Sequence, residues 1–276
     1  MERIIISDSG LELNQELEKR LNIKIVPFHL DLGDKSFVDE NLDIRNFINE
    51  MHAYMGAAKS AAPSPQAFYE KMLGADEVFI VTLTSKLSTV YNSASIARDM
   101  FLDDFPDKKV HVFDSKSAVA GETLIAIKIQ EMIDEGKSFE EIVERVEKFI
   151  KEMETLFVLE NLDNLIKNGR MSRLVGRIAS ALSINPVCKA DDGVIEVVNK
   201  TRGMKAGINR MVDQIIKSMG DASSKTLVIS HVLKPERAEE VKKKVLEKAS
   251  FKDIQIVGAK GLTSVYANEG GIVVAF

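Results

Sequence analysis

Cysteine is almost absent from the sequence, since Cys188 is the single thiol in 276 residues. One cysteine cannot form an internal disulfide, and such scarcity is typical of a reducing compartment. We interpret Cys188 as a packing residue rather than a nucleophile. Long apolar runs are also missing. The apolar stretch that follows Met1 is far too short for a signal peptide or a membrane span. We therefore expect a cytoplasmic protein with at most transient membrane contact.

An excess of positive charge is missing as well. The chain has 37 Lys and Arg against 42 Asp and Glu, for a formal net charge of −5. Contacts to a phosphate backbone need a basic face, so this balance argues against nucleic acid as a partner. The 45% hydrophobic and 29% charged residues are typical of a globular protein. The length suits one large domain or two ordinary ones.

Several signatures of catalytic and cofactor sites do not occur. The four histidines are scattered, and none has a partner at metal-ligand spacing, so we expect no metal. No GxGxxG, GxxxxGK[ST] or GxSxG motif is present, which leaves no nucleotide site and no nucleophile elbow. One enzyme alternative stays open. It is a serine-dependent hydrolase or acyltransferase that uses Ser88 or Ser60 with Asp8 or Asp114.

The first half of the chain alternates strand and helix patterns. The predicted strands cover residues 3–9, 23–32, 77–83 and 108–115. Ser64 followed by Pro65 predicts the start of a helix. Regular alternation predicts an α/β fold with a parallel sheet and helices on both of its faces.

The pattern changes from Ser138 onward. Ser138 and Glu141 form a capping box at the start of an amphipathic helix. Residues 185–201 are predicted to form a hairpin with its turn at Asp192 and Gly193. A hairpin among helices indicates a mixed or antiparallel sheet. We predict an N-terminal α/β domain over residues 1–154 and a C-terminal α+β domain over residues 155–276.

Small hydroxyl side chains gather in the loops that follow the predicted parallel strands. These loops are Ser7–Gly10, Thr84–Ser88 and Asp114–Ser117, and the corner Lys59–Pro65 resembles them. In an open parallel sheet, ligands bind outside the carboxyl ends of the strands. Hydroxyls and backbone N–H groups can hold a carboxylate without a full opposite charge. We therefore expect a site for a small anionic head on an apolar molecule.

The same residue types also have an ordinary structural explanation. Ser and Thr before helices are mostly caps, and Asp-Ser after strands mostly forms turns. Ser88 is expected to cap the next helix, with the N–H groups of Thr89 and Val90 facing an anion. The cluster of Arg170, Arg173 and Arg177 is either a solvated helix face or a docking patch for an anion or partner.

Seven segments, taken in order, carry a resemblance to a known family. They are "SDSG", "IVPFHLDLGDKSFVD", "KSAAPSP", "TSKLSTVYNSA", "VFDSKSAVAG", "LENLDNLIKNGRMSRLVG" and "KTRGMKA". The chain resembles the DegV family of bacterial fatty-acid-binding proteins over nearly its whole length. The resemblance implies two α/β domains with one buried long-chain fatty acid, no catalytic residue and no cofactor. It also implies a separate fatty-acid kinase as partner, which makes acyl phosphate for phospholipid synthesis.

The resemblance also implies which residues form the site. The fatty-acid carboxylate is expected at the hydroxyls of Ser60 and Ser88 and at the backbone of Ala61 and Thr89. Further candidate residues are the pocket neighbours Asp8, Ser9, Asp114, Ser115 and Tyr266, and the partner-docking arginines Arg170, Arg173 and Arg202.

Five positions depart from the family pattern near the expected carboxylate. Ala61 and Ala62 replace polar residues, Thr89-Val90 replaces Gly-Thr, and Tyr266 stands at a histidine position. These changes point to a weaker carboxylate clamp or a different lipid. Tyr266 still offers one hydroxyl.

Overall fold

A computed structural model describes residues 1–171 and 184–276. Arg173 and Arg177 lie outside the described residues. The N-terminal elements are β1 (Arg3–Asp8), α1 (Gln15–Arg20), β2 (Ile23–Val26), β3 (His29–Leu32), β4 (Lys35–Val38), α2 (Ile44–Ala53), β5 (Lys59–Ala61), α3 (Pro65–Met72), β6 (Glu77–Thr82), α4 (Val90–Asp104), β7 (Lys109–Asp114), α5 (Ala120–Asp134) and α6 (Phe139–Glu152). The C-terminal elements are β8 (Thr155–Val158), α7 (Asp163–Lys167), β9 (Val187–Asp191), β10 (Val194–Asn199), α9 (Met204–Ser218), η1 (Ala222–Ser224), β11 (Thr226–His231), α10 (Pro235–Leu246), β12 (Asp253–Gly258), α11 (Gly261–Ala267) and β13 (Ile272–Ala275).

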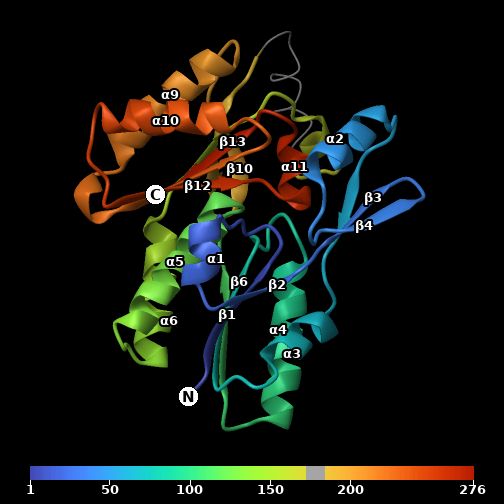
Figure 1. The fold of residues 1–276 in the computed structure, drawn as a ribbon, viewed down its shortest axis with the longest axis vertical. Coiled ribbons are helices and arrows are strands. Elements are labelled where there is room, and N and C mark those ends of the chain that lie inside the picture. The colour runs from blue at the N-terminus through green and yellow to red at the C-terminus, as the bar shows by residue number, and fades with distance from the viewer. Residues whose placement is uncertain (172–183) are drawn as a thin grey trace.

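The first sheet is parallel, with the strand order β2-β1-β6-β7. Figure 1 shows α3 and α4 beside one face of this sheet and α5 and α6 beside the other. Every residue of β6 is buried, as expected for a strand covered on both faces. The Ser64 side chain accepts the Ala67 N–H and caps α3. The α/β architecture predicted for this half is confirmed.

The predicted strand at residues 23–32 is wrong, because the chain forms two strands there. β2 belongs to the parallel sheet, whereas β3 pairs with β4 and β5 in a separate antiparallel sheet. Pro27 lies between the two strands and has no N–H for a sheet ladder. The Phe28 N–H donates instead to Ser9 Oγ at 3.0 Å. This turn places β5, with Ser60 opposite Leu30, at the edge of the candidate site.

The second sheet is mixed, with the strand order β10-β9-β8-β13-β11-β12, and only β11 and β12 pair in parallel. The predicted hairpin is confirmed as β9 and β10. Asp192 and Gly193 both have positive φ, 46° and 82°, as a two-residue hairpin turn requires. The sequence analysis missed α11, which lies between the last two strands. It is buried almost all round and therefore lacks the amphipathic period that marks a helix.

Helix α5 joins the two halves, because it contacts β1 and β6 of the first sheet and β11 and β13 of the second. One hydrophobic core accordingly contains residues from both halves, such as Ile5 and Val228. The change of sheet falls between Glu152 and Thr155, although a domain boundary at Glu154 stays a prediction. Within the described residues, we find no helix with the length and apolarity needed to cross a membrane.

The tip of the β9–β10 hairpin contacts the loop after β6, and this contact yields a test. A Cβ at Gly193 would collide with Thr84 Oγ1, and φ there is left-handed. Gly74 has a similar φ of +89° with no atom near its added Cβ. We expect Gly74→Ala to cost about 1–2 kcal/mol from backbone strain alone. Gly193→Ala should cost at least about 1 kcal/mol more, from overpacking.

Urea unfolding of both variants measures the difference. Equal losses of stability in the two variants would contradict docking of the hairpin tip on Thr84.

Candidate functional site

A cavity of about 400 Å³ lies between the carboxyl ends of the parallel strands and the second sheet. All four loops singled out from the sequence contribute to its wall. Gly10, Thr84, Ser117 and Ser60 are one lining residue from each. The opposite side of the wall comes from β8, β13 and the β9–β10 hairpin. The volume lies within the range of small-molecule sites.

The middle of the cavity is apolar. Phe28, Phe157, Leu159 and Leu262 line it, and each is at most 9% exposed. These side chains come from both halves of the chain. An apolar chain that entered this space would therefore lose contact with water along most of its length.

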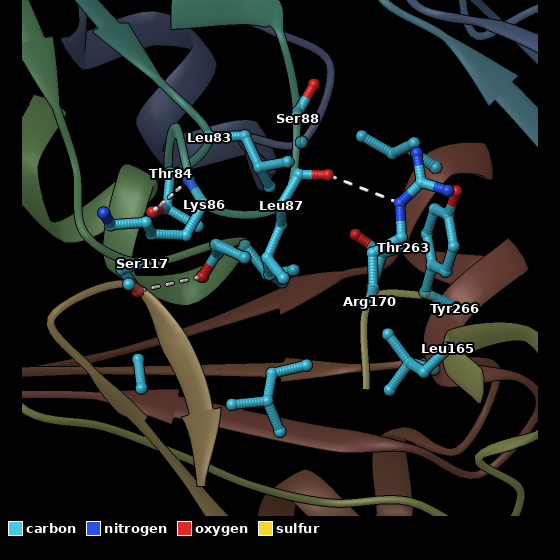
Figure 2. A pocket seen from close by; sticks show the side chains of 18 of the residues that line it. Leu83, Thr84, Lys86, Leu87, Ser88, Ser117, Leu165, Arg170, Thr263 and Tyr266 are labelled. Atoms are coloured by element: carbon cyan, nitrogen blue, oxygen red, sulfur yellow. Dashed lines mark hydrogen bonds between the residues drawn. The ribbon is translucent and has the colours of Figure 1, made fainter. Parts of the chain in front are cut away.

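One end of the cavity carries polar groups. The hydroxyls of Ser60 and Tyr266 form a hydrogen bond of 2.8 Å, although the residues come from β5 and α11. The Arg170 guanidinium lies 5.8 Å from the centre of the Tyr266 ring. Figure 2 shows Arg170 and Tyr266 side by side at this end. The register of β5 and the burial of α11 bring the hydroxyls together, which no local sequence pattern indicates.

Arg170 occupies a position that the sequence analysis did not foresee. The sequence predicts for its cluster a solvated helix face or a docking patch for an anion or partner, and the Arg170 side chain lines the cavity. Arg170 Nε donates to the Leu87 carbonyl at 3.3 Å, and a terminal nitrogen donates to the Asn168 carbonyl at 2.7 Å. Asn168 in turn donates to the Ala58 carbonyl at 2.9 Å. The polar end therefore holds a full positive charge in addition to hydroxyls.

Ser88 and Thr89 line the cavity just before α4. The expectation that Ser88 is the N-cap is wrong, because the N-cap is Thr89 and its side chain makes no capping bond. Residues 84–88 already form a turn in which the Ser88 N–H donates to the Thr84 carbonyl at 3.2 Å. This turn shifts the helix start by one residue. Ser88 Oγ still accepts the Val90 N–H at 3.3 Å.

The other candidates that the sequence analysis names, where the structure describes them, do not line the cavity. Ala61 is exposed and does not line the cavity, while Ala62 does. Asp114 lies in an outer groove, and Ser115 is buried with its hydroxyl donating to the Ser117 carbonyl.

Arg202 is exposed and pairs through its backbone with Ile184. Arg173 lies outside the described residues. Neither Asp8 nor Ser9 reaches the cavity surface, and both lie behind the wall.

Asp8 and Glu122 fix three loops of the wall from behind. Asp8 accepts the N–H groups of Gly10 and Leu83, each at 2.8 Å, and Glu122 accepts that of Val119 at 3.0 Å. Gly10, Leu83 and Val119 all line the cavity. Burial raises the pKa of Asp8 to about 6. Burial, together with the neighbouring Asp8 charge, raises the pKa of Glu122 well above its usual range.

Asp39 and Glu12 fix the start of α11 in the same way. Asp39 accepts the N–H groups of Gly261 and Leu262 at 2.7 and 2.9 Å. Glu12 accepts the Lys260 N–H at 3.2 Å and the Ser230 hydroxyl. Burial raises the pKa of Asp39, and it raises that of Glu12 to about 7. These contacts position the helix that carries Tyr266. The sequence analysis missed Glu12, Asp39 and Glu122 as parts of the site, because lone acidic residues carry no motif.

Metal chemistry finds no support in residues 1–171 and 184–276, where no group of three or more His, Cys, Asp or Glu could hold an ion. Burial raises the pKa of the Cys188 thiol to about 12, which fits a packing residue.

Comparison with known proteins identifies the family. A family model described as "Uncharacterised protein, DegV family" matches residues 3–276. The chain belongs to the DegV family. A DegV domain-containing protein of Streptococcus pneumoniae strain R6 is 37% identical over 276 residues, covering 99% of this chain and 98% of its own.

Solved structures of DegV proteins resemble the chain equally closely. A DegV family protein from Ruminococcus gnavus, refined with vaccenic acid, has a TM-score of 0.95 and 36% identity, with 99% of each chain covered. The Streptococcus pneumoniae Fatty Acid Kinase (Fak) B3 protein, loaded with linoleic acid, has a TM-score of 0.93 and 35% identity. The comparison covers 100% of this chain and 99% of that one.

The buried carboxyl groups predict how stability depends on pH. Glu12 has a pKa of about 7 in the folded protein, against 4.5 for an ordinary glutamate in an unfolded chain. The folded state therefore binds more protons than the unfolded state between these values, so stability falls as pH rises from about 4.5 to about 7. We expect Glu12→Gln to remove roughly 2–3 kcal/mol of the stability loss between about pH 5 and pH 8.

Urea unfolding at both pH values checks this expectation. Glu140→Gln is the control, because a hydrogen bond from Lys109 lowers the pKa of Glu140, which therefore stays ionised throughout. A Glu12→Gln variant with the full parental pH dependence would contradict the assignment.

Proposed function

We propose that this chain binds one long-chain fatty acid, with the acyl chain in the cavity and the carboxylate beside Ser60, Tyr266 and Arg170. The observation that carries the proposal is the layout of the cavity, in which buried apolar side chains from both halves of the chain adjoin the Ser60 and Tyr266 hydroxyls and the Arg170 guanidinium. Relatives at 36%, 35% and 31% identity have structures with vaccenic, linoleic and heptadecanoic acid. Ser88 and Thr89 lie at the same wall and complete the proposed carboxylate site.

The two parts of the ligand have different roles in this proposal. A hydrogen bond to a charged group contributes roughly 1.5–3 kcal/mol, and each buried methylene about 0.8 kcal/mol. A chain of about sixteen carbons therefore contributes several times more than the head. The cavity supplies affinity, and the polar end selects an acid and fixes its direction. No metal or cofactor is required.

Transfer to a separate fatty-acid kinase is the second part of the proposal. One relative is a B3 protein of a fatty acid kinase system, which supports such a partner. Arg202 is exposed and available for docking, and Arg173 stays a candidate from the sequence. Such a carrier works in the cytoplasm, with at most transient membrane contact and without nucleic acid.

The hydrolase alternative receives no support from the described part of the cavity wall. Ser60 is paired with a tyrosine hydroxyl rather than an imidazole. No histidine is among the described lining residues, so neither Ser60 nor Ser88 has a general base of that kind. We therefore propose that the chain is a binding protein rather than an enzyme.

Organic extraction of the purified protein followed by mass spectrometry tests the ligand directly. We expect one fatty acid per chain, because an apolar cavity of this size retains its ligand through purification. Recovery of no lipid, combined with turnover of ester substrates, would instead favour the hydrolase.

Removing hydroxyls tests the carboxylate site. We expect Ser88→Ala and Tyr266→Phe each to weaken fatty-acid binding by roughly 10- to 100-fold, since each removes a hydrogen bond to a charged group. Binding of the methyl ester of the same acid should change much less. Ser95→Ala is the matched control, because Ser95 bonds the Tyr91 carbonyl outside the cavity. Titration calorimetry with acid and ester checks both variants, and unchanged selectivity would remove these residues from the site.

A further inference from the structure

Two hydroxyl groups line the end of the cavity away from Tyr266, on the side where Thr84 and Lys86 also lie (Figure 2). Ser117 Oγ and Thr155 Oγ1 form a hydrogen bond of 2.7 Å, and the residues are 2% and 4% exposed. Ser117 follows β7, and Thr155 is the first residue of β8. Figure 2 shows Ser117 at the opposite side of the cavity from Tyr266 and Arg170.

A second hollow lies directly behind this pair. It is a groove of about 790 Å³, and Thr155 and Ala190 line both the groove and the cavity. The groove is otherwise rich in charged side chains, such as Asp114, Lys116 and Asp192. A wall only one side chain thick therefore separates the cavity from a charged groove.

The packing around the pair keeps this wall thin and fixed. Gly121, in the first turn of α5, lies against it, since an added Cβ would collide with Ser117 Oγ and come within 3.1 Å of Thr155 Oγ1. On the groove side, Lys116 Nζ lies 3.5 Å from carboxylate oxygens of both Asp114 and Asp192. Gly121 thus packs directly against the two hydroxyls, and the ion pairs lie on the groove side of the wall.

We propose that the Ser117–Thr155 pair is the end stop that sets the longest acyl chain this cavity accepts. The inference rests on the proposed fatty-acid binding and adds the feature that selects among fatty acids. A terminal methyl group can pack against the pair while its hydrogen bond stays intact. A longer chain must separate the two hydroxyls and leave that of Thr155 without a partner against hydrocarbon, which is unfavourable.

Methylenes beyond the wall also gain little. Charged side chains dominate the groove lining, so a chain that enters it makes fewer apolar contacts than it makes inside the cavity. We therefore expect affinity to rise with chain length by about fourfold for each methylene until the chain reaches the wall, and then to stop rising.

Binding of a homologous series of saturated acids, from lauric to behenic acid, tests the end stop. Ser117→Ala/Thr155→Ala opens the wall, and Ala190→Leu thickens it while keeping both hydroxyls. For an acid two carbons past the parental limit, we expect the double variant to bind roughly tenfold more tightly than the parent. Ala190→Leu should shift the limit to shorter acids. Gln214 lines only the groove, so the control variant Gln214→Ala should keep the parental chain-length limit.

The outcomes separate the end stop from the proposed function. A parental protein that binds none of the acids removes the proposed function itself. If the parent has a limit that both wall variants leave unchanged, fatty-acid binding stands and the end stop is overturned. Should the double variant fail to fold, as judged by circular dichroism, the shift in Ala190→Leu alone decides.

Discussion

Hydrogen bonds from main-chain N–H groups to buried carboxylates hold the wall of the cavity in place. Asp8 and Glu122 receive such groups from three wall loops, and Asp39 and Glu12 receive them from the start of α11. A buried carboxyl group is costly unless it is hydrogen-bonded or protonated, and both conditions are met here. Because the acids act from behind, no carboxylate lines the cavity among the described residues, and an anionic ligand makes no direct contact with the acids that shape its site.

The fold follows largely from features that are local in the sequence. Strand and helix alternation predicts the parallel sheet, and the capping box at Ser138 and the Asp192-Gly193 turn predict a helix start and a hairpin. Pro27 marks a strand break that the continuous apolar pattern of residues 23–32 conceals. Helix α11 is missed because it is buried almost all round, so its residues show no periodic alternation between apolar and polar positions.

The candidate site is less predictable, because its decisive contacts join distant residues. The sequence can nominate the hydroxyl loops, since loops at the carboxyl ends of parallel strands share one edge. It cannot pair Ser60 with Tyr266 across 206 positions, nor place Arg170 inside the cavity rather than on a surface. Both results depend on the register of β5 and on the position of α11, which buried acids remote in sequence determine.

The direction of the ligand follows from how hydroxyl protons are used at the two ends. At the far end, Thr155 can donate to Ser117 while Ser117 donates to the Ala118 carbonyl at 3.4 Å, so both protons have acceptors. At the polar end, the bond between Ser60 and Tyr266 uses one of two protons, and among the described residues no other acceptor receives the second. That proton, together with the Arg170 charge, is available to a carboxylate. In the proposed binding mode, two hydroxyl pairs of similar chemistry thus have opposite effects: one receives the acid head, and the other ends the apolar space.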